Sequence, residues 1–305
     1  MISADSVKAR LRNLAKKEDD AFDNLLRHYF TERLLYRLSV SSYADNFILK
    51  GGRLLYVILE NEARATRDVD FLAWRIENTP EELIRIFAEI CAIQSDDAVR
   101  FDSSSITAQR IKEDADYEGV RIKLTGYLGN TRQVLQFDIG YGDVVVPKPL
   151  ELDYPSLLDM EQPRLKAYST ESVIAEKFEA MLSLTETNSR MKDFYDIYIL
   201  SRTYDFDGFT LYEAIRQTLE RRGTVMERLP IVFSPEFLQG ERIQPMWHAF
   251  QQRIKVTQSV SAEETLAQIR TFLQPIYESI LNEDEFFGSW SKQSASSGSW
   301  RRCDG

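Results

Sequence analysis

The sequence predicts an α/β domain with a mixed sheet, followed by a helical domain. Alternation of polar and apolar residues, which is typical of strands, is concentrated in the first half of the chain, whereas later segments carry apolar residues at steps of three and four, as helices do. The chain has 305 residues, 43% of them hydrophobic, which is enough for two cores. The predicted limits are 1–165 for the first domain, 166–287 for the second, and 288–305 for a disordered tail rich in Ser and Gly.

The elements of the first domain follow from local patterns. Residues 5–40 have helical periodicity, and a short apolar run ends at Gly51-Gly52 before the next predicted helix. Residues 68–72 alternate like a strand. The segment Thr79-Pro80-Glu81-Glu82 predicts a helix start, because Thr caps, Pro suits the first helical position and acids favour the first turn. We therefore expect helices and strands in close succession.

Residues 118–143 predict a β-hairpin with its turn at Gly129-Asn130. A four-residue loop at 129–132 would place Lys123 opposite Asp138 on the polar face. In that register, apolar residues also meet apolar residues on the other face, and a slip of one residue would break both matches. We therefore predict the pair Lys123–Asp138.

Strand patterns become sparse in the second half of the chain, where helical periodicity dominates. Five helices are predicted there, over residues 171–185, 191–203, 210–221, 243–256 and 262–281. We find no internal repeat.

Composition narrows the chemistry. No apolar run is long enough to span a membrane, the N-terminus has no signal-peptide pattern, and the two cysteines lie far apart, so we expect a cytoplasmic protein without a disulfide framework. The two histidines, His28 and His248, have no neighbouring histidine or cysteine, which argues against a zinc site. Metal chemistry would therefore depend on carboxylates, which prefer Mg²⁺ or Mn²⁺.

The net charge of −10 argues against a protein that coats nucleic acid without sequence preference. The first 50 residues are nevertheless net basic, and Lys8, Arg12 and Lys16 form one stripe of the predicted helix. This stripe is either an ordinary solvated face or an arm that contacts phosphates. Arg216, Arg221 and Arg222 form a second basic group, in the helical domain.

Three aspartates are the strongest candidates for catalysis. Asp68 and Asp70 are two residues apart on a predicted strand, so both side chains point to one face, and a divalent cation would relieve their repulsion. Asp138 lies on an otherwise apolar strand and would complete a three-acid site for one or two Mg²⁺ ions. The alternatives are a surface pair of aspartates and a simple Lys123–Asp138 ion pair.

Two further features have a functional and a structural interpretation. Gly51-Gly52 lies between a strand and a helix, where glycines let a phosphate approach the backbone, although a plain tight turn is the alternative. Lys177 interrupts an apolar helix stripe, and Asp193 and Asp196 do so on the next helix. Lys177 would contact nucleotide phosphates with Asp193 as its orienting partner, or else form a structural ion pair with Asp193 or Asp196.

The order of these motifs resembles the AbiEii/AbiGii toxin family, which is related to the MenT toxins. Five segments carry the resemblance, which extends over residues 20–260: Phe47-Ile-Leu-Lys-Gly-Gly-Arg-Leu-Leu, Thr66-Arg-Asp-Val-Asp-Phe71, Phe137-Asp138, Ala175-Glu-Lys-Phe178 and Arg190-Met-Lys-Asp-Phe-Tyr-Asp-Ile197. The last segment is the most specific. The resemblance implies a polymerase-beta-like nucleotidyltransferase domain joined to a helical domain.

The resemblance also implies roles for individual residues. Asp68, Asp70 and Asp138 would bind Mg²⁺ or Mn²⁺, and Asp138 would also act as a base. Nucleotide binding would involve Gly51, Gly52, Arg53, Lys177 and Asp196, with Lys177 and Asp193 also counted as catalytic. Arg53 is a departure, because many nucleotidyltransferases have Ser or Thr after the two glycines.

The resulting hypothesis is a toxin-like enzyme of a type IV toxin–antitoxin or abortive-infection system. It would transfer a nucleoside monophosphate from a nucleoside triphosphate (NTP) to an acceptor hydroxyl at the 3′ end of an RNA, with tRNA as the expected acceptor. Its partner would be a cognate antitoxin that acts as a DNA-binding repressor. The alternatives are a nucleotidyl- or phosphotransferase that acts on protein, and a catalytically inert binding protein of the same fold.

Overall fold

The computed structural model describes residues 2–18, 20–60, 66, 68–114, 117–184, 190–234, 237, 243–254, 260–292 and 299–302. The chain divides into two compact units. Unit 1 comprises Met1–Val57, Thr66–Gly142 and Leu150–Ala167, and unit 2 comprises Ile58–Ala65, Asp143–Pro149 and Tyr168–Gly305. Two short segments of unit 2 therefore interrupt unit 1 in the sequence.

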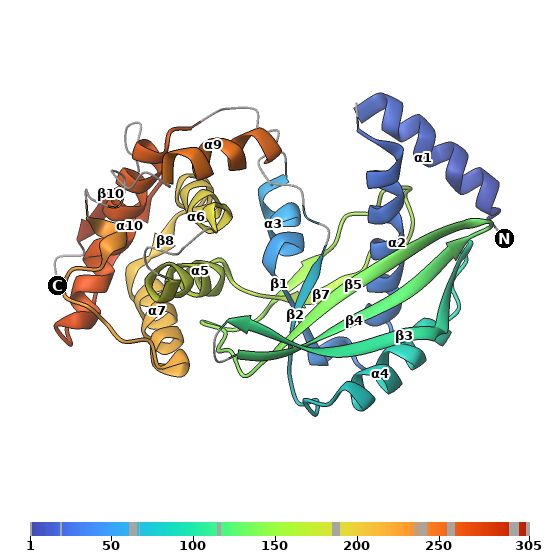
Figure 1. Ribbon diagram of the computed structural model, residues 1–305, viewed down its shortest axis with the longest axis horizontal. Helices are drawn as coiled ribbons and strands as arrows, with labels where there is room; N and C mark the ends of the chain where they lie inside the picture. The colour runs from blue at the N-terminus through green and yellow to red at the C-terminus, as the bar shows by residue number, and fades with distance from the viewer. Residues whose placement is uncertain are drawn as a thin grey trace. The chain divides into compact units, whose positions relative to one another are not determined.

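Unit 1 is built on a seven-stranded mixed sheet with the strand order β3-β4-β5-β2-β1-β7-β6 (Figure 1). Neighbouring strands are antiparallel except for the parallel pairs β2–β5 and β1–β7. This arrangement confirms the predicted mixed α/β class. The strands are β1 Phe47–Lys50, β2 Val69–Ala73, β3 Val99–Asp114, β4 Tyr117–Leu128, β5 Thr131–Tyr141, β6 Leu150–Asp153 and β7 Arg164–Ala167.

The helices of this part of the chain are α1 Ala4–Glu18, α2 Phe22–Ser39, α3 Gly51–Leu59 and α4 Pro80–Ala92, with a short 3-10 helix at Ala44–Asn46. The predicted helix over 5–40 is thus two helices. The predicted start of α4 is confirmed, since the Thr79 hydroxyl accepts a hydrogen bond from the Glu82 amide at 3.3 Å and Pro80 takes the first position.

One face of the sheet forms the core of unit 1. Phe137 of β5 contacts Phe87 of α4, and a Cβ at Gly126 of β4 would meet the ring of Phe30 of α2. Phe137 is opposite Ile122 of β4, and Ile122 and Gly126 point to the same side of that strand. Helices α2 and α4 therefore cover the same face of the sheet. The opposite face of β3–β5 is the one that carries the polar residues.

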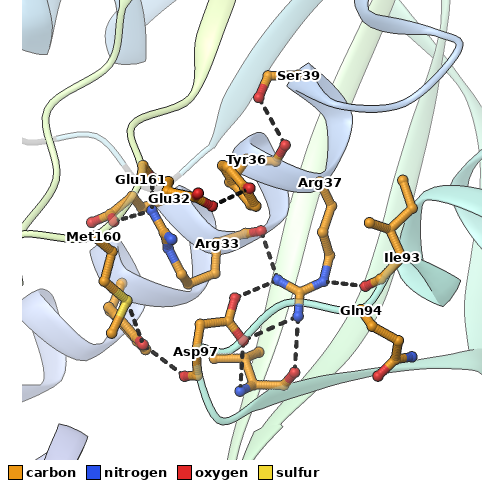
Figure 2. A network of polar contacts seen from close by, with 12 residues as sticks. Glu32, Arg33, Tyr36, Arg37, Ser39, Ile93, Gln94, Asp97, Met160 and Glu161 are labelled. Atoms are coloured by element: carbon orange, nitrogen blue, oxygen red, sulfur yellow. Dashed lines mark hydrogen bonds and ion pairs between the residues drawn. The ribbon is translucent and has the colours of Figure 1, made fainter. Parts of the chain in front are cut away.

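A buried ion pair ties α2 to the loop between α4 and β3 (Figure 2). Two nitrogens of Arg37 donate to the Asp97 carboxylate at 2.6 and 3.1 Å, and the guanidinium also donates to the carbonyls of Arg33, Ile93 and Val99. Asp97 is fully buried and also accepts from the Val99 amide. Each charged group therefore has its hydrogen bonds made, which a buried pair needs in order not to destabilise the fold.

The register of the β4–β5 hairpin corrects the prediction. The turn contains only Gly129 and Asn130, because Leu128 pairs directly with Thr131. Gly129 has a φ of +58°, which suits the tight two-residue turns of hairpins. The register is therefore shifted by two residues, and Arg121 rather than Lys123 lies opposite Asp138. A shift of two keeps every side chain on its predicted face.

Unit 2 is mainly helical, with short strands. Its helices are α5 Thr170–Leu184, α6 Met191–Thr203, α7 Gly208–Arg222, α9 Ile243–Ile254 and α10 Ala262–Leu281, with a 3-10 helix at Ile231–Phe233. Strands β8 Phe206–Asp207, β9 Gly288–Ser291 and β10 Ser299–Arg302 form a small sheet in the order β10-β9-β8. Among the residues described, no helix combines the length and the apolar character that crossing a membrane requires.

Strands β9 and β10 differ from the disordered tail expected over 288–305. Trp290 is 1% exposed and donates to the Ser201 carbonyl at 2.7 Å, and Trp300 stacks on Phe272. Two large aromatic side chains thus anchor a segment whose composition is otherwise polar, because burial of Trp290 and stacking of Trp300 offset the cost of ordering the backbone. Residues 293–298 and 303–305 lie outside the described part of the tail.

Candidate active site

The Gly51-Gly52 turn lies directly against an aspartate of the neighbouring strand. In the β1–β2 register, Lys50 is paired with Asp70, so the turn begins where Asp70 projects. Gly51 has a φ of +67°, and a Cβ there would lie 2.1 Å from Asp70 Oδ2. A Cβ at Gly52 would lie 2.8 Å from the Thr66 side chain. Both positions therefore require glycine, and the turn places backbone next to a carboxylate.

Three aspartates lie at neighbouring positions of two parallel strands. Asp70 of β2 is the register partner of Asp138 of β5, and Asp68 precedes β2 by one residue. The buried side chains of Val69 and Phe71 alternate with Asp68 and Asp70, so both acids point away from the core. The structure thus brings together the three acids that the sequence singled out.

Arg121 of β4 supplies positive charge to this group. Its Nε and Nη2 donate to the two oxygens of Asp138, each at 2.8 Å, in a bidentate pair. The hydrogen bond with Asp138 raises the pKa of the Arg121 guanidinium, and the charges of Asp68 and Asp70 raise it further. The predicted Lys123–Asp138 pair is therefore wrong, and an arginine two residues earlier takes this place.

Gln136 completes the surroundings of Asp68. Its side-chain amide donates to Asp68 Oδ1 at 3.1 Å. Sequence reasoning missed both Gln136 and Arg121. The signal was present, since both alternate with apolar residues on the predicted polar faces of β4 and β5, but it requires the two-residue turn to be recognised.

The donor set suits a hard divalent cation only in part. Within the described ranges, no three His, Cys, Asp or Glu side chains form a group arranged to hold a metal ion. Both oxygens of Asp138 accept hydrogen bonds from Arg121, so this carboxylate is already engaged by a cation. Asp68 and Asp70 offer carboxylate oxygens on one face, and the charge of Arg121 interacts with both of them. The residues thus fit a cation held mainly by Asp68 and Asp70.

Unit 2 contains a charged cluster of its own. Lys177 of α5 donates to Asp193 Oδ1 and to Asp196 Oδ2 of α6, each at 2.7 Å. Arg190 also pairs with Asp193, at 2.9 Å. All three residues of the Lys177 group are buried, and the two aspartates are each 1% exposed. The sequence left open which aspartate would pair with Lys177, and in the structure both do.

The electrostatics of this cluster depend on Lys177. Burial by itself would raise the pKa of the Asp193 carboxyl, but the positive charges of Lys177 and Arg190 outweigh it and hold that pKa below its ordinary value. Asp193 is thus ionised in the folded protein, and the ammonium group of Lys177 stabilises its buried negative charge while also donating to Asp196.

Comparison with known proteins identifies the family. Residues 33–272 match the family described as nucleotidyl transferase AbiEii toxin, type IV TA system. The chain belongs to this family. The AbiEii family implies an enzyme that uses a nucleoside triphosphate and has a cognate antitoxin. No curated protein matches the chain.

Two solved structures are similar to the AbiEii chain. JHP933 from Helicobacter pylori is 13% identical, with a TM-score of 0.47, over 86% of this chain and 95% of the other. MenT4, a nucleotidyltransferase toxin from Mycobacterium tuberculosis, is 15% identical, with a TM-score of 0.45, over 94% of this chain and 100% of the other.

Arg53 follows the AbiEii glycine turn, but its side chain points into the core of unit 1. It is fully buried, and its three guanidinium nitrogens have no hydrogen-bond partner of normal geometry among the described residues. The Tyr154 hydroxyl nevertheless lies close enough to interact with it. Burial, aided by the Arg53 charge, lowers the pKa of His28 to about 3. Arg53 thus places positive charge beneath the turn rather than beside it.

Two of the three basic residues predicted as a group in the AbiEii helical domain are paired with acids. Arg216 pairs with Glu213 and Glu220, each within 3 Å. Arg222 is partly buried and pairs with Glu179 at 2.7 Å and with Asp143 at 3.2 Å. The predicted group of Arg216, Arg221 and Arg222 therefore does not form a surface of unpaired positive charge.

Proposed function

We propose that this AbiEii toxin transfers a nucleoside monophosphate from an NTP to a hydroxyl at the 3′ end of an RNA, with tRNA as the acceptor. The acceptor oxygen forms a bond to the α-phosphorus, the bond between the α-phosphorus and its bridging oxygen to the β-phosphate breaks, and pyrophosphate leaves. The observation that carries the proposal is the grouping of Asp68, Asp70 and Asp138 beside the Gly51-Gly52 turn.

In this proposal the three acids have distinct roles. Asp68 and Asp70 hold Mg²⁺ or Mn²⁺, since their side chains share one face and lie next to the glycine turn. A divalent ion would neutralise phosphate charge and orient the reacting groups. Asp138 lies next to Asp70 and accepts the proton of the acceptor hydroxyl, while Arg121 holds its carboxylate in position.

Nucleotide binding is assigned to the turn and to the buried cations. The backbone at Gly51 and Gly52 starts α3, whose N-terminus favours the negative charge of a triphosphate. Arg53 adds positive charge from below. Lys177 neutralises phosphate charge. Asp193 orients the Lys177 ammonium group, and Asp196 is the second acid that accepts a hydrogen bond from it.

The partner in the cell is proposed to be an antitoxin that acts as a DNA-binding repressor. This proposal rests on the family, which implies a cognate antitoxin. Co-expression with the adjacent gene, followed by co-purification and a promoter-binding assay, tests both halves of the statement. If the product of the neighbouring gene relieves toxicity but does not bind DNA, the partner is an antitoxin that is not a repressor.

The decisive experiment uses each of the four NTPs, labelled at the α-phosphate, with purified tRNA, total RNA and total protein. We expect label on tRNA with Mg²⁺ or Mn²⁺ and none in excess EDTA. Asp68→Ala and Asp70→Ala serve as inactive controls. Label on protein and never on RNA would favour the protein-modifying alternative. No transfer of any label by a folded protein would favour an inert binding protein.

A further inference from the structure

The exposed face of strands β3, β4 and β5 carries a row of basic residues around an aromatic ring. In the strand register, Tyr127 of β4 lies between Arg100 of β3 and Arg132 of β5. The Arg100 guanidinium lies over the Tyr127 ring, 4.6 Å from its centroid. Lys123 lies on the same face of β4 as Tyr127, four residues earlier in the strand. We call Arg100, Lys123, Tyr127 and Arg132 the basic face.

The basic face leads along the sheet to the candidate active site. On β4, side chains at every second residue share a face, so Tyr127, Lys123 and Arg121 point the same way. Arg121 is opposite Asp138, which in turn is next to Asp70. Tyr127 and Arg121 are six positions apart, which corresponds to about 20 Å of strand. One continuous surface thus joins the aromatic residue to the three acids.

The three cations of the basic face differ in their partners from several other basic residues of the chain. Arg100, Lys123 and Arg132 are exposed, and within the described part of the chain no carboxylate forms an ion pair with any of them. By contrast, Arg85, Arg216 and Arg222 each pair with glutamates. In a chain of net charge −10, three exposed cations gathered on one face of a sheet indicate a surface that complements an anion.

One acid and one further cation border the basic face. Asp102 lies in the row between Arg100 and Lys123, where it accepts hydrogen bonds from Ser104. At the hairpin turn, Lys8 Nζ of α1 lies 3.5 Å from the position that a Cβ of Gly129 would take, although Lys8 also pairs with Asp5. The positive charge therefore extends from the sheet to the start of the α1 stripe.

We propose that the basic face binds the single-stranded 3′ segment of the acceptor RNA. A base stacks on Tyr127, and phosphates contact Arg100, Lys123 and Arg132, which guides the terminal hydroxyl towards Asp138. An aromatic ring flanked by cations on an open sheet favours single strands, because their bases are free to stack, whereas a duplex buries them. The proposal rests on the proposed function in that it supplies the acceptor for that site.

The test measures binding without catalysis. Fluorescence anisotropy with a short labelled single-stranded RNA is recorded without NTP or metal, in an Asp70→Ala background, over a series of NaCl concentrations. The triple variant Arg100→Ala/Lys123→Ala/Arg132→Ala is compared with Arg164→Ala/Arg228→Ala/Arg253→Ala, which removes the same charge elsewhere. We expect the first to lower the log–log salt slope by about 2, since each phosphate contact contributes about 0.7, and the control to leave it nearly unchanged.

The role of Tyr127 is tested separately. Tyr127→Leu is expected to weaken binding of single-stranded RNA on the order of tenfold, whereas Tyr127→Phe, which keeps the ring, retains it. A duplex RNA of the same sequence should bind more weakly than the single strand. Circular dichroism and thermal melts of each variant show whether it is folded before its affinity is compared.

Three outcomes would overturn the inference. The first is equal binding by the basic-face triple variant and its control, and the second is loss of binding only in Arg12→Ala/Lys16→Ala, which would assign RNA to the α1 stripe. The third is equal affinity for duplex and single strand. Because none of these measurements requires nucleotidyl transfer, failure of the proposed reaction would leave their result readable. Conversely, transfer to RNA by a basic-face variant with unchanged affinity would refute this inference and keep the function.

Discussion

Replacing Lys177 by methionine tests whether the buried cluster of unit 2 is structural. Methionine keeps the length of the side chain and suits the apolar stripe of α5 but removes the ammonium that Asp193 and Asp196 share at 2.7 Å. Breaking a buried ion pair by removing one partner costs about 3–5 kcal/mol. Two carboxylates depend on Lys177, but Arg190 still contacts Asp193, so we expect a loss within that range.

This magnitude is measurable by denaturant and thermal unfolding. A loss of about 3–5 kcal/mol corresponds to a fall in Tm of roughly 10 °C for a unit of this size. Lys177→Arg should recover part of the loss. Lys177→Met/Asp196→Asn should also be more stable than Lys177→Met alone, because one buried negative charge is removed with the positive one. A double-mutant cycle over these variants gives the coupling directly.

The pH dependence provides an independent check. In the native protein the lowered pKa of Asp193 contributes stability that is present above the ordinary carboxyl pKa and is lost as pH falls through the lower, folded value. Without Lys177 that contribution shrinks, so the difference in unfolding free energy between native and Lys177→Met should be largest at neutral pH and smaller in acid. A variant with native stability at neutral pH and impaired use of NTP would refute the structural reasoning and favour a purely catalytic lysine.

Three further predictions concern unit 1. Asp70→Ala should abolish transfer and keep or raise the Tm of the metal-free protein, since it relieves repulsion among three acids; near-normal turnover would contradict this. Arg121→Ala should cost about 1–3 kcal/mol of stability, because Asp138 loses both its donors, and should increase the thermal shift caused by Mn²⁺; an unchanged shift would show that Arg121 does not compete with the cation. His28, whose pKa lies near 3 against an ordinary 6.5, resists protonation in the folded state. The contribution of His28 to the free energy of unfolding is complete above pH 6.5 and should fall by about 2 kcal/mol between about pH 7 and pH 5. His28→Phe should remove this pH dependence, which urea titrations at each pH would measure.

Several features of this protein follow from local sequence. Thr79 and Pro80 predict the start of α4, and a hydroxyl cap followed by a residue with a fixed φ acts within one turn of helix. Asp68 and Asp70 predict two carboxylates on one face, because the alternation of a strand is a property of its own backbone. The helices of unit 2 were likewise predicted within a few residues from their periodicity.

The partners of these groups were decided by the tertiary structure. Pairing Asp138 with Lys123 or with Arg121 gives the same alternation, since a register shift of two residues leaves each side chain on its face, and only the length of the turn selects between them. Burial of Trp290 and stacking of Trp300 on Phe272 organise a tail whose composition predicts disorder, because the contacts come from residues distant in sequence. The sharing of Lys177 by two aspartates depends on how α5 packs on α6. Local periodicity thus determined which face each side chain occupies, while packing and turn geometry, which depend on distant residues, determined what each one meets there.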